Sequence, residues 1–151
     1  MALRERLDQD LKTAMRASDT LRRDTIRLLI SSLRNAEIEN RGALDAAAED
    51  RVVAREIKQR RDSVEEYEKA GRTDLAAREQ AEMDVLKAYQ PEQLSPEDIR
   101  AIVETAIART GAVGMADIGR VMKDALSEVK GRADGGVVNA VARELLKGGQ
   151  G

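Results

Sequence analysis

The two prolines of this 151-residue chain stand close together, at Pro91 and Pro96, and the segments on both sides space their apolar residues as helices do. Proline breaks a helix interior, so this pair marks a boundary in an otherwise helical chain. No segment alternates apolar and polar residues for long, as a half-buried strand would. The sequence therefore predicts an all-α fold with two domains, residues 1–90 and residues 91–151.

The first domain is predicted to be a bundle of about four helices. Their expected spans are residues 3–15, 20–40, 45–70 and 73–89. The second of them carries apolar residues on two sides, with Leu28 nearly opposite Ile30, which is typical of a central helix. The fourth has a thin apolar stripe, and we expect it to lie across the others.

The second domain is predicted to contain three helices. Residues 95–98, Ser-Pro-Glu-Asp, combine an N-cap, a proline at the first helical position and acids in the first turn. Three apolar stripes at helical spacing follow, separated by glycine-bearing turns, and Asp134 is the expected N-cap of the last one. We expect the glycine-rich end of the chain, residues 148–151, to fray.

The composition removes several kinds of chemistry. The chain contains no His, Cys, Phe or Trp, and only two Tyr. Disulfides, thiolate or imidazole catalysis and the usual zinc sites are therefore excluded, and we expect neither a metal nor another cofactor. Carboxylate pairs are frequent but lie among counter-charges, so the sequence identifies no catalytic residue. With a net charge of −2, an anionic partner must be met by a local basic patch.

The expected location follows from hydropathy and codon-linked composition. No apolar run is long enough to span a membrane, and the first residues contain no apolar segment of signal-peptide length. Arg outnumbers Lys, 19 to 7, as in G+C-rich bacterial genomes. We therefore expect a bacterial protein of the cytoplasm.

A turn with two cations before a helix start is the first candidate site. Its cations and glycines are Lys130, Gly131, Arg132 and Gly135, with Lys123 and Arg120 as assisting cations on the preceding helix. The amides and the dipole at a helix N-terminus attract an anion, and the cations add direct charge. The turn therefore predicts a phosphate contact. The alternative is that Asp134 caps the helix and fills the place of the anion.

A second basic surface is predicted on the helix over residues 20–40. Four arginines lie within about 40° of one another at 100° per residue, namely Arg23, Arg27, Arg34 and Arg41. Such a stripe either tracks phosphates or is a solvated face that pairs with acids of neighbouring helices. Because it borders Ile30, we expect Arg27 and Arg34 to be half-buried. Their expected partners are carboxylates such as Glu37 and Glu65.

A third charged segment lies on the helix over residues 45–70. Residues 58–61, Lys-Gln-Arg-Arg, follow Arg51 and Arg55 and are followed by several acids. Blocks of both signs on one helix are typical of a solvated face laced with ion pairs. The alternative is a surface that docks a partner.

Six blocks of the chain, in order, resemble the YqeY-like proteins of the GatB/YqeY group. They are residues 3–16, 25–38, 59–76, 89–95, 119–123 and 129–135. The most distinctive is 59–72, Gln-Arg-Arg-Asp-Ser-Val-Glu-Glu-Tyr-Glu-Lys-Ala-Gly-Arg. The resemblance implies an all-α fold with an N-terminal helical domain and a C-terminal three-helix tail.

The same resemblance implies a function. In the B subunit of the glutamine-dependent aminoacyl-tRNA amidotransferase, the corresponding tail helps to hold tRNA, while catalysis lies elsewhere. A carbon–nitrogen ligase label, with glutamine as amido donor, is attached to the family by this similarity, but none of the catalytic residues has a counterpart here. We therefore expect a non-catalytic, tRNA-associated accessory module. The alternative is a protein–protein interaction module with no nucleic-acid role.

Overall fold

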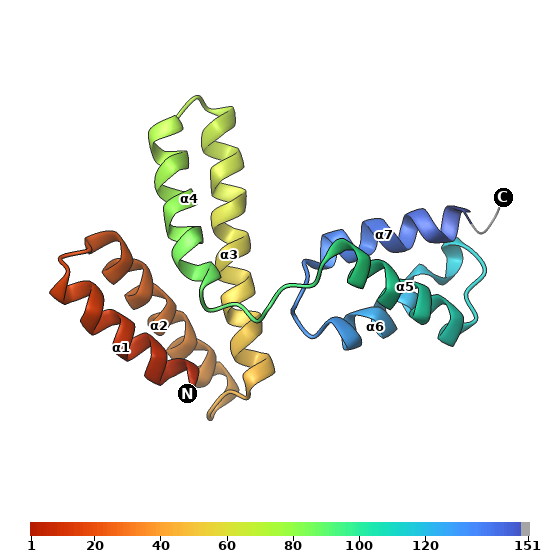
Figure 1. Cartoon of the computed structure of the whole chain (residues 1–151), viewed down its shortest axis with the longest axis horizontal. Helices are drawn as coiled ribbons and strands as arrows, with labels where there is room; N and C mark the ends of the chain where they lie inside the picture. Colours follow the sequence, from red (N-terminus) through yellow and green to blue (C-terminus); the bar gives the residue numbers. More distant parts are fainter. Residues whose placement is uncertain (149–151) are drawn as a thin grey trace. The chain divides into compact units, whose positions relative to one another are not determined.

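The computed structural model describes residues 1–148, which form α-helices joined by short turns and one short 3-10 helix (Figure 1). The prediction of an all-α fold is confirmed. Over these residues, no helix is both long enough and apolar enough to cross a membrane. The expected fraying of residues 149–151 lies outside the described part of the chain, whereas Gly148 still belongs to the last helix.

Contacts within the chain define two compact units. The N-terminal unit is Met1–Gln90 and the C-terminal unit is Pro91–Gly151. The buried apolar residues form two clusters that share no member, one in each unit. Each unit therefore has a core of its own.

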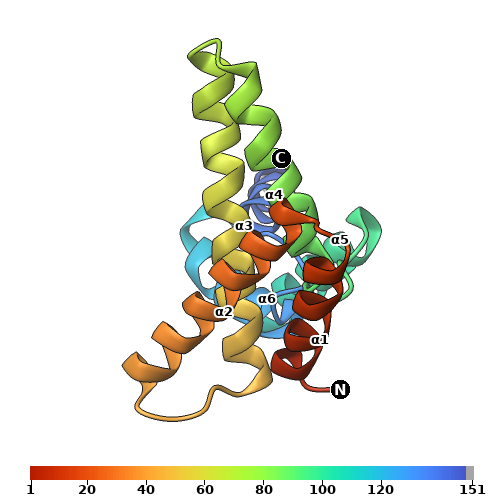
Figure 2. The ribbon, with the colours of Figure 1, turned by 90° about the vertical axis from the view of Figure 1, so that its left-hand side faces the viewer.

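The N-terminal unit is built from two pairs of antiparallel helices. The first pair is α1 (Leu3–Arg16) with α2 (Thr20–Asn40), and the second is α3 (Ala46–Lys69) with α4 (Thr73–Lys87). The two helices of each pair pack against each other, and α3 and α4 run side by side in both Figure 1 and Figure 2. Because α2 also packs against α3 and α4, it joins the two pairs.

The core of the N-terminal unit lies between these pairs. It is formed by Leu7, Ile26, Leu29, Ile30, Leu33, Val52, Val53, Ile57, Met83, Leu86 and Tyr89. The prediction that α2 packs on two opposite sides is wrong at Leu28, which remains 49% exposed. No helix of the unit covers that side, so the second apolar row of α2 faces solvent in the unit itself.

The position of α4 also differs from the prediction. The helix runs along α3 and not across the bundle, and it buries Ala76, Met83 and Leu86. Its apolar stripe is thin, and polar contacts to α3 supply part of the interface. The ion pair between Arg60 of α3 and Glu82 of α4 is one such contact.

The C-terminal unit is a three-helix bundle preceded by a capped turn. Its elements are α5 (Pro96–Thr110), the 3-10 helix η1 (Met115–Asp117), α6 (Ile118–Val129) and α7 (Gly135–Gly148). Ser95 Oγ accepts from the Asp98 amide at 3.1 Å, and Asp98 Oδ2 accepts from the Ser95 amide at 3.3 Å. This reciprocal capping fixes where α5 begins. The buried core is formed by Ile99, Val103, Ala106, Val121, Ala125, Val129, Val138, Ala142 and Leu146.

Candidate nucleic-acid interface

The turn between α6 and α7 is held in one conformation by its backbone. Lys130 ends α6 with a φ of 51°, and Gly131 follows with a φ of 76°, so two successive residues are left-handed. The Arg132 amide donates to the Val129 carbonyl at 3.0 Å, and the Arg132 carbonyl accepts from the Leu94 amide at 2.8 Å. The turn is thus tied both to the end of α6 and to the segment that precedes α5.

The N-terminus of α7 is occupied by Asp134. Its Oδ1 accepts from the Gly136 amide at 2.9 Å, and its carbonyl accepts from the amides of Val137 and Val138 at 3.0 and 3.1 Å. The expectation that Asp134 caps this helix is confirmed. Gly135, the first residue of α7, has open space around it. A phosphate that approached this helix start would have to displace the Asp134 carboxylate.

The outer face of α6 carries two of the predicted cations. Lys123 and Lys130 are both exposed and lie seven positions apart, which puts them about 10 Å apart along the axis and on nearly the same face. The buried residues Val121, Ala125 and Val129 face the other way, into the bundle. Neither lysine forms an ion pair within residues 1–148.

Two acids on the flank of α6 share one arginine of α5. Arg109 Nη1 lies 3.3 Å from Asp124 Oδ1 and 3.3 Å from Glu128 Oε1. These carboxylates are therefore drawn to α5, away from the face that carries the two lysines. Lys123 and Lys130 themselves form no ion pair with these two acids.

The remaining predicted cations are held by local contacts. Arg120 Nη2 lies 2.7 Å from Asp117 Oδ1, and its Nη1 donates to the Thr110 carbonyl at 2.9 Å. The hydrogen bond from Arg120 keeps the pKa of Asp117 below its usual range. Arg132 is half-buried, and its Nε donates to the Val129 carbonyl at 3.3 Å. The structure therefore groups Lys123 with Lys130 and leaves Arg120 paired with an acid.

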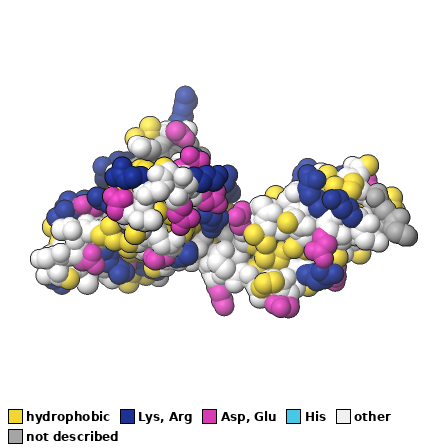
Figure 3. Space-filling model, turned by 90° about the horizontal axis from the view of Figure 1, so that it is seen from above, with side chains coloured by type: hydrophobic (Ala, Val, Ile, Leu, Met, Phe, Trp, Pro, Cys, Tyr) yellow, Lys and Arg dark blue, Asp and Glu magenta, His cyan; other side chains and the backbone are white. Residues whose placement is uncertain are grey.

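One arginine of the α2 stripe is paired with the acid next to it in the chain. Arg23 Nε lies 2.9 Å from Asp24 Oδ1, and this bond keeps the pKa of Asp24 below its usual range. Arg41 ends the helix in a left-handed conformation, with a φ of 56°. On the face of the N-terminal unit shown in Figure 3, Lys and Arg side chains are interspersed with Asp and Glu. Charge on this surface is therefore mixed.

The expected burial of two of these arginines is wrong. Arg27 and Arg34 are both exposed, and neither forms an ion pair in the part of the chain that the structure describes. Arg27 Nη2 instead lies 4.0 Å from the Met15 sulfur, on α1. Around the axis of α2, Ile30 lies at the edge of the face that other helices cover. The arginines lie on the next face and therefore stay in solvent.

Arg60 is the charged residue whose environment the sequence analysis missed. It belongs to the segment predicted for solvent, yet its exposed fraction is 9%. Its Nη1 lies 2.6 Å from Glu56 Oε2, and its Nε lies 3.5 Å from Glu82 Oε2. Ser32 Oγ of α2 donates to Glu56 Oε1 at 2.7 Å, which extends the cluster to a third helix.

A signal for this burial was present in the spacing of α3. Val53, Ile57 and Arg60 follow one another at i, i+4 and i+7, so the arginine continues the buried seam of the helix. The distinctive block that begins at Gln59 therefore contains a structural cation that joins α2, α3 and α4.

Comparison with known proteins places this fold in a family. The chain matches the family model described as "Yqey-like protein" over residues 4–146. It is similar to fungal proteins named "Altered inheritance of mitochondria protein 41, mitochondrial". The one from Lachancea thermotolerans is 45% identical over 84 residues, which are 55% of this chain and 45% of that protein. The one from Pyrenophora tritici-repentis is 33% identical over 130 residues, which are 85% and 71%.

The named relatives correct two expectations. They are fungal, and their names place them in mitochondria, which contradicts the expectation of a bacterial protein of the cytoplasm. An Arg-to-Lys ratio reflects codon composition and does not identify the kind of organism. The names mention neither tRNA nor a ligase reaction. The chain also spans less than half the length of several of these proteins, including the one from Lachancea thermotolerans.

The family assignment itself does not depend on any one motif. The family model extends from α1 to the last turns of α7, so it includes both units and the turn between α6 and α7. The resemblance seen in the six sequence blocks is thereby confirmed, and the chain belongs to the YqeY-like protein family.

Proposed function

We propose that this protein is a non-catalytic accessory module whose C-terminal unit contacts the backbone phosphates of tRNA through the outer face of α6. One observation carries the proposal. Arg109 pairs with both Asp124 and Glu128 on the flank of the helix, while Lys123 and Lys130 stay exposed without an ion pair in the described chain. Lysines about 10 Å apart on one helix face can each meet a backbone phosphate.

The conformation of Lys130 supports this reading. The residue occupies a left-handed position at the end of α6, where glycine is favoured and a side chain is strained. A cation there gains some energy from the helix dipole. Its exposed ammonium group also projects from a turn whose backbone is fixed to Val129 and Leu94, so the charge is presented from a rigid support.

The expected interaction is weak and sensitive to salt. The chain as a whole is acidic, and two lysines with Arg132 nearby amount to few phosphate contacts. Each phosphate contact contributes a slope of about −0.7 to −0.9 to the plot of log affinity against log salt. Two lost contacts should therefore reduce this slope by about 1.4 to 1.8.

Filter binding of bulk tRNA at several salt concentrations tests the proposal. We expect Lys123→Ala/Lys130→Ala to bind more weakly than the wild-type chain and to show the reduced slope. The matched control is Arg143→Ala/Lys147→Ala, which removes two exposed cations from α7 of the same unit and keeps the net charge equal. This control should retain the slope of the wild type.

Equal affinity and equal slope for the two double variants would contradict the proposal, because the effect would then depend on net charge alone. Absence of tRNA binding by the wild-type chain at low salt would favour the alternative of a protein-interaction module without a nucleic-acid role.

A further inference from the structure

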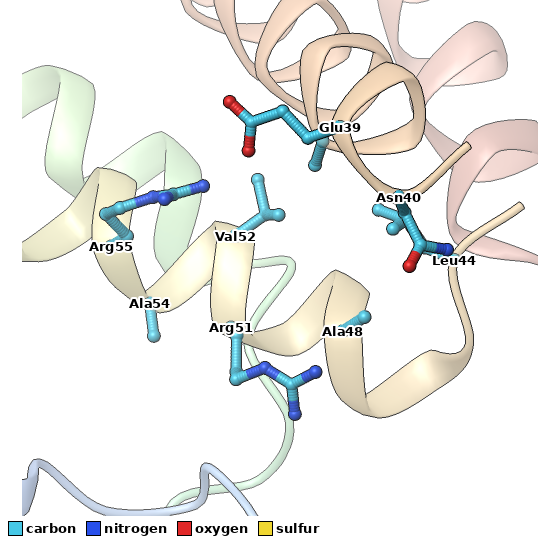
Figure 4. A pocket seen from close by; sticks show the side chains of 9 residues that line it. Glu39, Asn40, Leu44, Ala48, Arg51, Val52, Ala54 and Arg55 are labelled. Atoms are coloured by element: carbon cyan, nitrogen blue, oxygen red, sulfur yellow. The ribbon is translucent and has the colours of Figure 1, made fainter. Parts of the chain in front are cut away.

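Two hollows in the N-terminal unit differ in what lines them. The first lies between the last turns of α2 and the first turns of α3, where Glu39 and Arg55 reach toward each other above Val52 (Figure 4). Its rim carries charges of both signs, so it favours neither an anionic nor a cationic ligand. The second lies at the turn between α1 and α2 and encloses about 200 Å³. Its lining residues are Ala14, Met15, Ser18, Asp19, Thr20 and Arg23.

Met15 is the oxidisable side chain at the second hollow. Its exposed fraction is 51%, against 76% for Met1 and 6% for Met83, which belongs to the core. The Ser18 amide donates to the Met15 carbonyl at 3.2 Å, so the backbone of the turn holds Met15 in place. The Met15 side chain is therefore open to small oxidants, and an oxygen atom added to its sulfur does not enter the core.

A guanidinium group stands at the sulfur atom of Met15. Arg27 Nη2, on α2, donates to this sulfur at 4.0 Å. In residues 1–148 no carboxylate forms an ion pair with Arg27, and Asp24, one turn before it, is held by Arg23 at 2.9 Å. A thioether sulfur is only a weak acceptor. Over the described residues, the partner of the Arg27 side chain is therefore a weak one.

We propose that Met15 is a site of reversible oxidation by a hydroperoxide, and that Arg27 binds the sulfoxide oxygen formed there. The sulfur attacks one oxygen of the peroxide, the O–O bond breaks and an S–O bond forms. Sulfur loses two electrons, and the proton of the transferred hydroxyl passes to the leaving oxygen, which departs as water when the oxidant is hydrogen peroxide. The product is methionine sulfoxide, which cellular reductases return to methionine.

The distance between Arg27 and the sulfur suits the oxidised side chain. One S–O bond and one N–H···O hydrogen bond of about 2.9 Å, meeting at an angle, span a gap of 4.0 Å. The sulfoxide oxygen is a better acceptor than the sulfur, and a hydrogen bond from a charged donor is stronger than a neutral one. Oxidation therefore strengthens a contact between α1 and α2.

This outcome is the opposite of what oxidation does in a core. At Met83, which is buried, an added oxygen would be a polar group without a partner and would lower stability. At Met15 the oxygen meets water on one side and Arg27 on the other. The sign of the stability change thus distinguishes a sulfoxide that Arg27 holds from simple damage.

The experiment treats the full chain with dilute hydrogen peroxide and locates each sulfoxide by peptide mass spectrometry. Urea unfolding followed by tyrosine fluorescence reports the N-terminal unit, which contains both tyrosines. We expect Met15 to be oxidised well before Met83. Oxidation should lower the unfolding equilibrium constant of this unit about two- to fivefold, because the new hydrogen bond is exposed. Treatment with both epimer-specific methionine sulfoxide reductases should restore the original value.

Four variants assign the effect to the two residues. Met15→Leu removes the sulfur and Arg27→Ala removes the donor, so neither should be stabilised by peroxide. Arg27→Lys keeps a charged donor and should retain part of the effect. Arg34→Ala, which removes an exposed arginine about 10 Å further along α2, should respond as the wild type does. Far-UV circular dichroism establishes that each variant is folded before oxidation.

Three results would overturn the proposal. They are oxidation of Met15 no faster than that of Met83, a destabilised N-terminal unit in the oxidised wild type, and the same response to peroxide in the wild type and in Arg27→Ala. The guanidinium NMR signals of Arg27 should also shift on oxidation, and unshifted signals would contradict the contact. None of these results bears on Lys123 and Lys130, which lie in the other unit.

Discussion

The hydroxyl group of Tyr89 donates to Oδ2 of Asp10 at 2.6 Å, although the two residues are 79 positions apart. The guanidinium group of Arg6 lies 5.2 Å from the centre of the Tyr89 ring and donates to the Ala88 carbonyl at 3.0 Å. Tyr89 is buried, so this contact fastens α1 to the end of α4 just before Pro91. It secures the point at which the N-terminal unit ends.

Tyr89→Phe should lower the free energy of unfolding by about 1.5–3 kcal/mol, because a buried hydrogen bond to a carboxylate is lost. Urea unfolding followed by far-UV circular dichroism measures the change. Tyr67→Phe is the matched control, since Tyr67 is only half-buried, and it should change stability by less than about 0.5 kcal/mol. Equal effects of the two substitutions would show that the Asp10 contact contributes nothing.

The titration of Tyr89 gives a second prediction. Burial and the neighbouring Asp10 carboxylate raise the pKa of Tyr89 from 10.0 to about 12. A raised folded-state pKa stabilises the protein below the unfolded-state pKa, and this contribution is lost as the pH rises from 10 to 12. The stability difference between the wild type and Tyr89→Phe should therefore narrow over that range.

The direct readout is tyrosinate absorbance in Tyr67→Phe, where Tyr89 is the only tyrosine and the chain has no tryptophan. A midpoint at or below the ordinary tyrosine value of 10.0 in the folded protein would contradict the predicted environment.

Removal of the buried cation in α3 should be costly. Arg60→Met leaves Glu56 and Glu82 close together and partly buried without their shared partner. Breaking such a buried pair from one side lowers stability by about 3–5 kcal/mol. Thermal unfolding compared with Arg55→Met, an exposed position on the same helix, measures the difference. A loss below about 1 kcal/mol would mean that water reaches this cluster.

The separate cores predict separate effects of core substitutions. Val121→Ala should destabilise the C-terminal unit by about 1–3 kcal/mol, and Val53→Ala should do the same to the N-terminal unit. Both tyrosines lie in the N-terminal unit, so tyrosine fluorescence reports that unit alone, whereas circular dichroism reports both. Val121→Ala should shift only the circular dichroism transition. A shift of the tyrosine signal by the same amount would show that the units unfold together.

Replacement of Lys130 by glycine should change stability and tRNA binding in opposite directions. Lys130→Gly relieves a left-handed backbone position and should raise the free energy of unfolding by about 0.5–1 kcal/mol, while tRNA binding falls. Arg41→Gly relieves the same strain at the end of α2 and should raise stability without changing tRNA binding. Unfolding curves and filter binding on the same samples provide the comparison. Weaker tRNA binding by both variants would remove Lys130 from the proposed interface.

The sequence by itself determined where the helices begin and end. Ser95 and Asp134 cap α5 and α7 as predicted, and α2 and α3 begin within one residue of their predicted starts. These features depend on hydrogen bonds and steric limits within a few residues, so they can be predicted locally.

The cationic turn before α7 was likewise predictable as a turn. The sequence did not show which backbone amides of the turn are free to bind an anion, because Asp134 could serve either as a cap or as the neighbour of a bound anion.

Only the tertiary structure decided which charges are paired and which faces are covered. Arg60 became buried because α4 brings Glu82 to α3, Leu28 stayed exposed because no helix of its unit covers that side of α2, and Arg109 reached across from α5 to hold two acids of α6. Burial and ion pairing depend on which helices become neighbours. The local spacing of residues on a single helix sets the face on which each charge stands, but it does not specify what packs against that face.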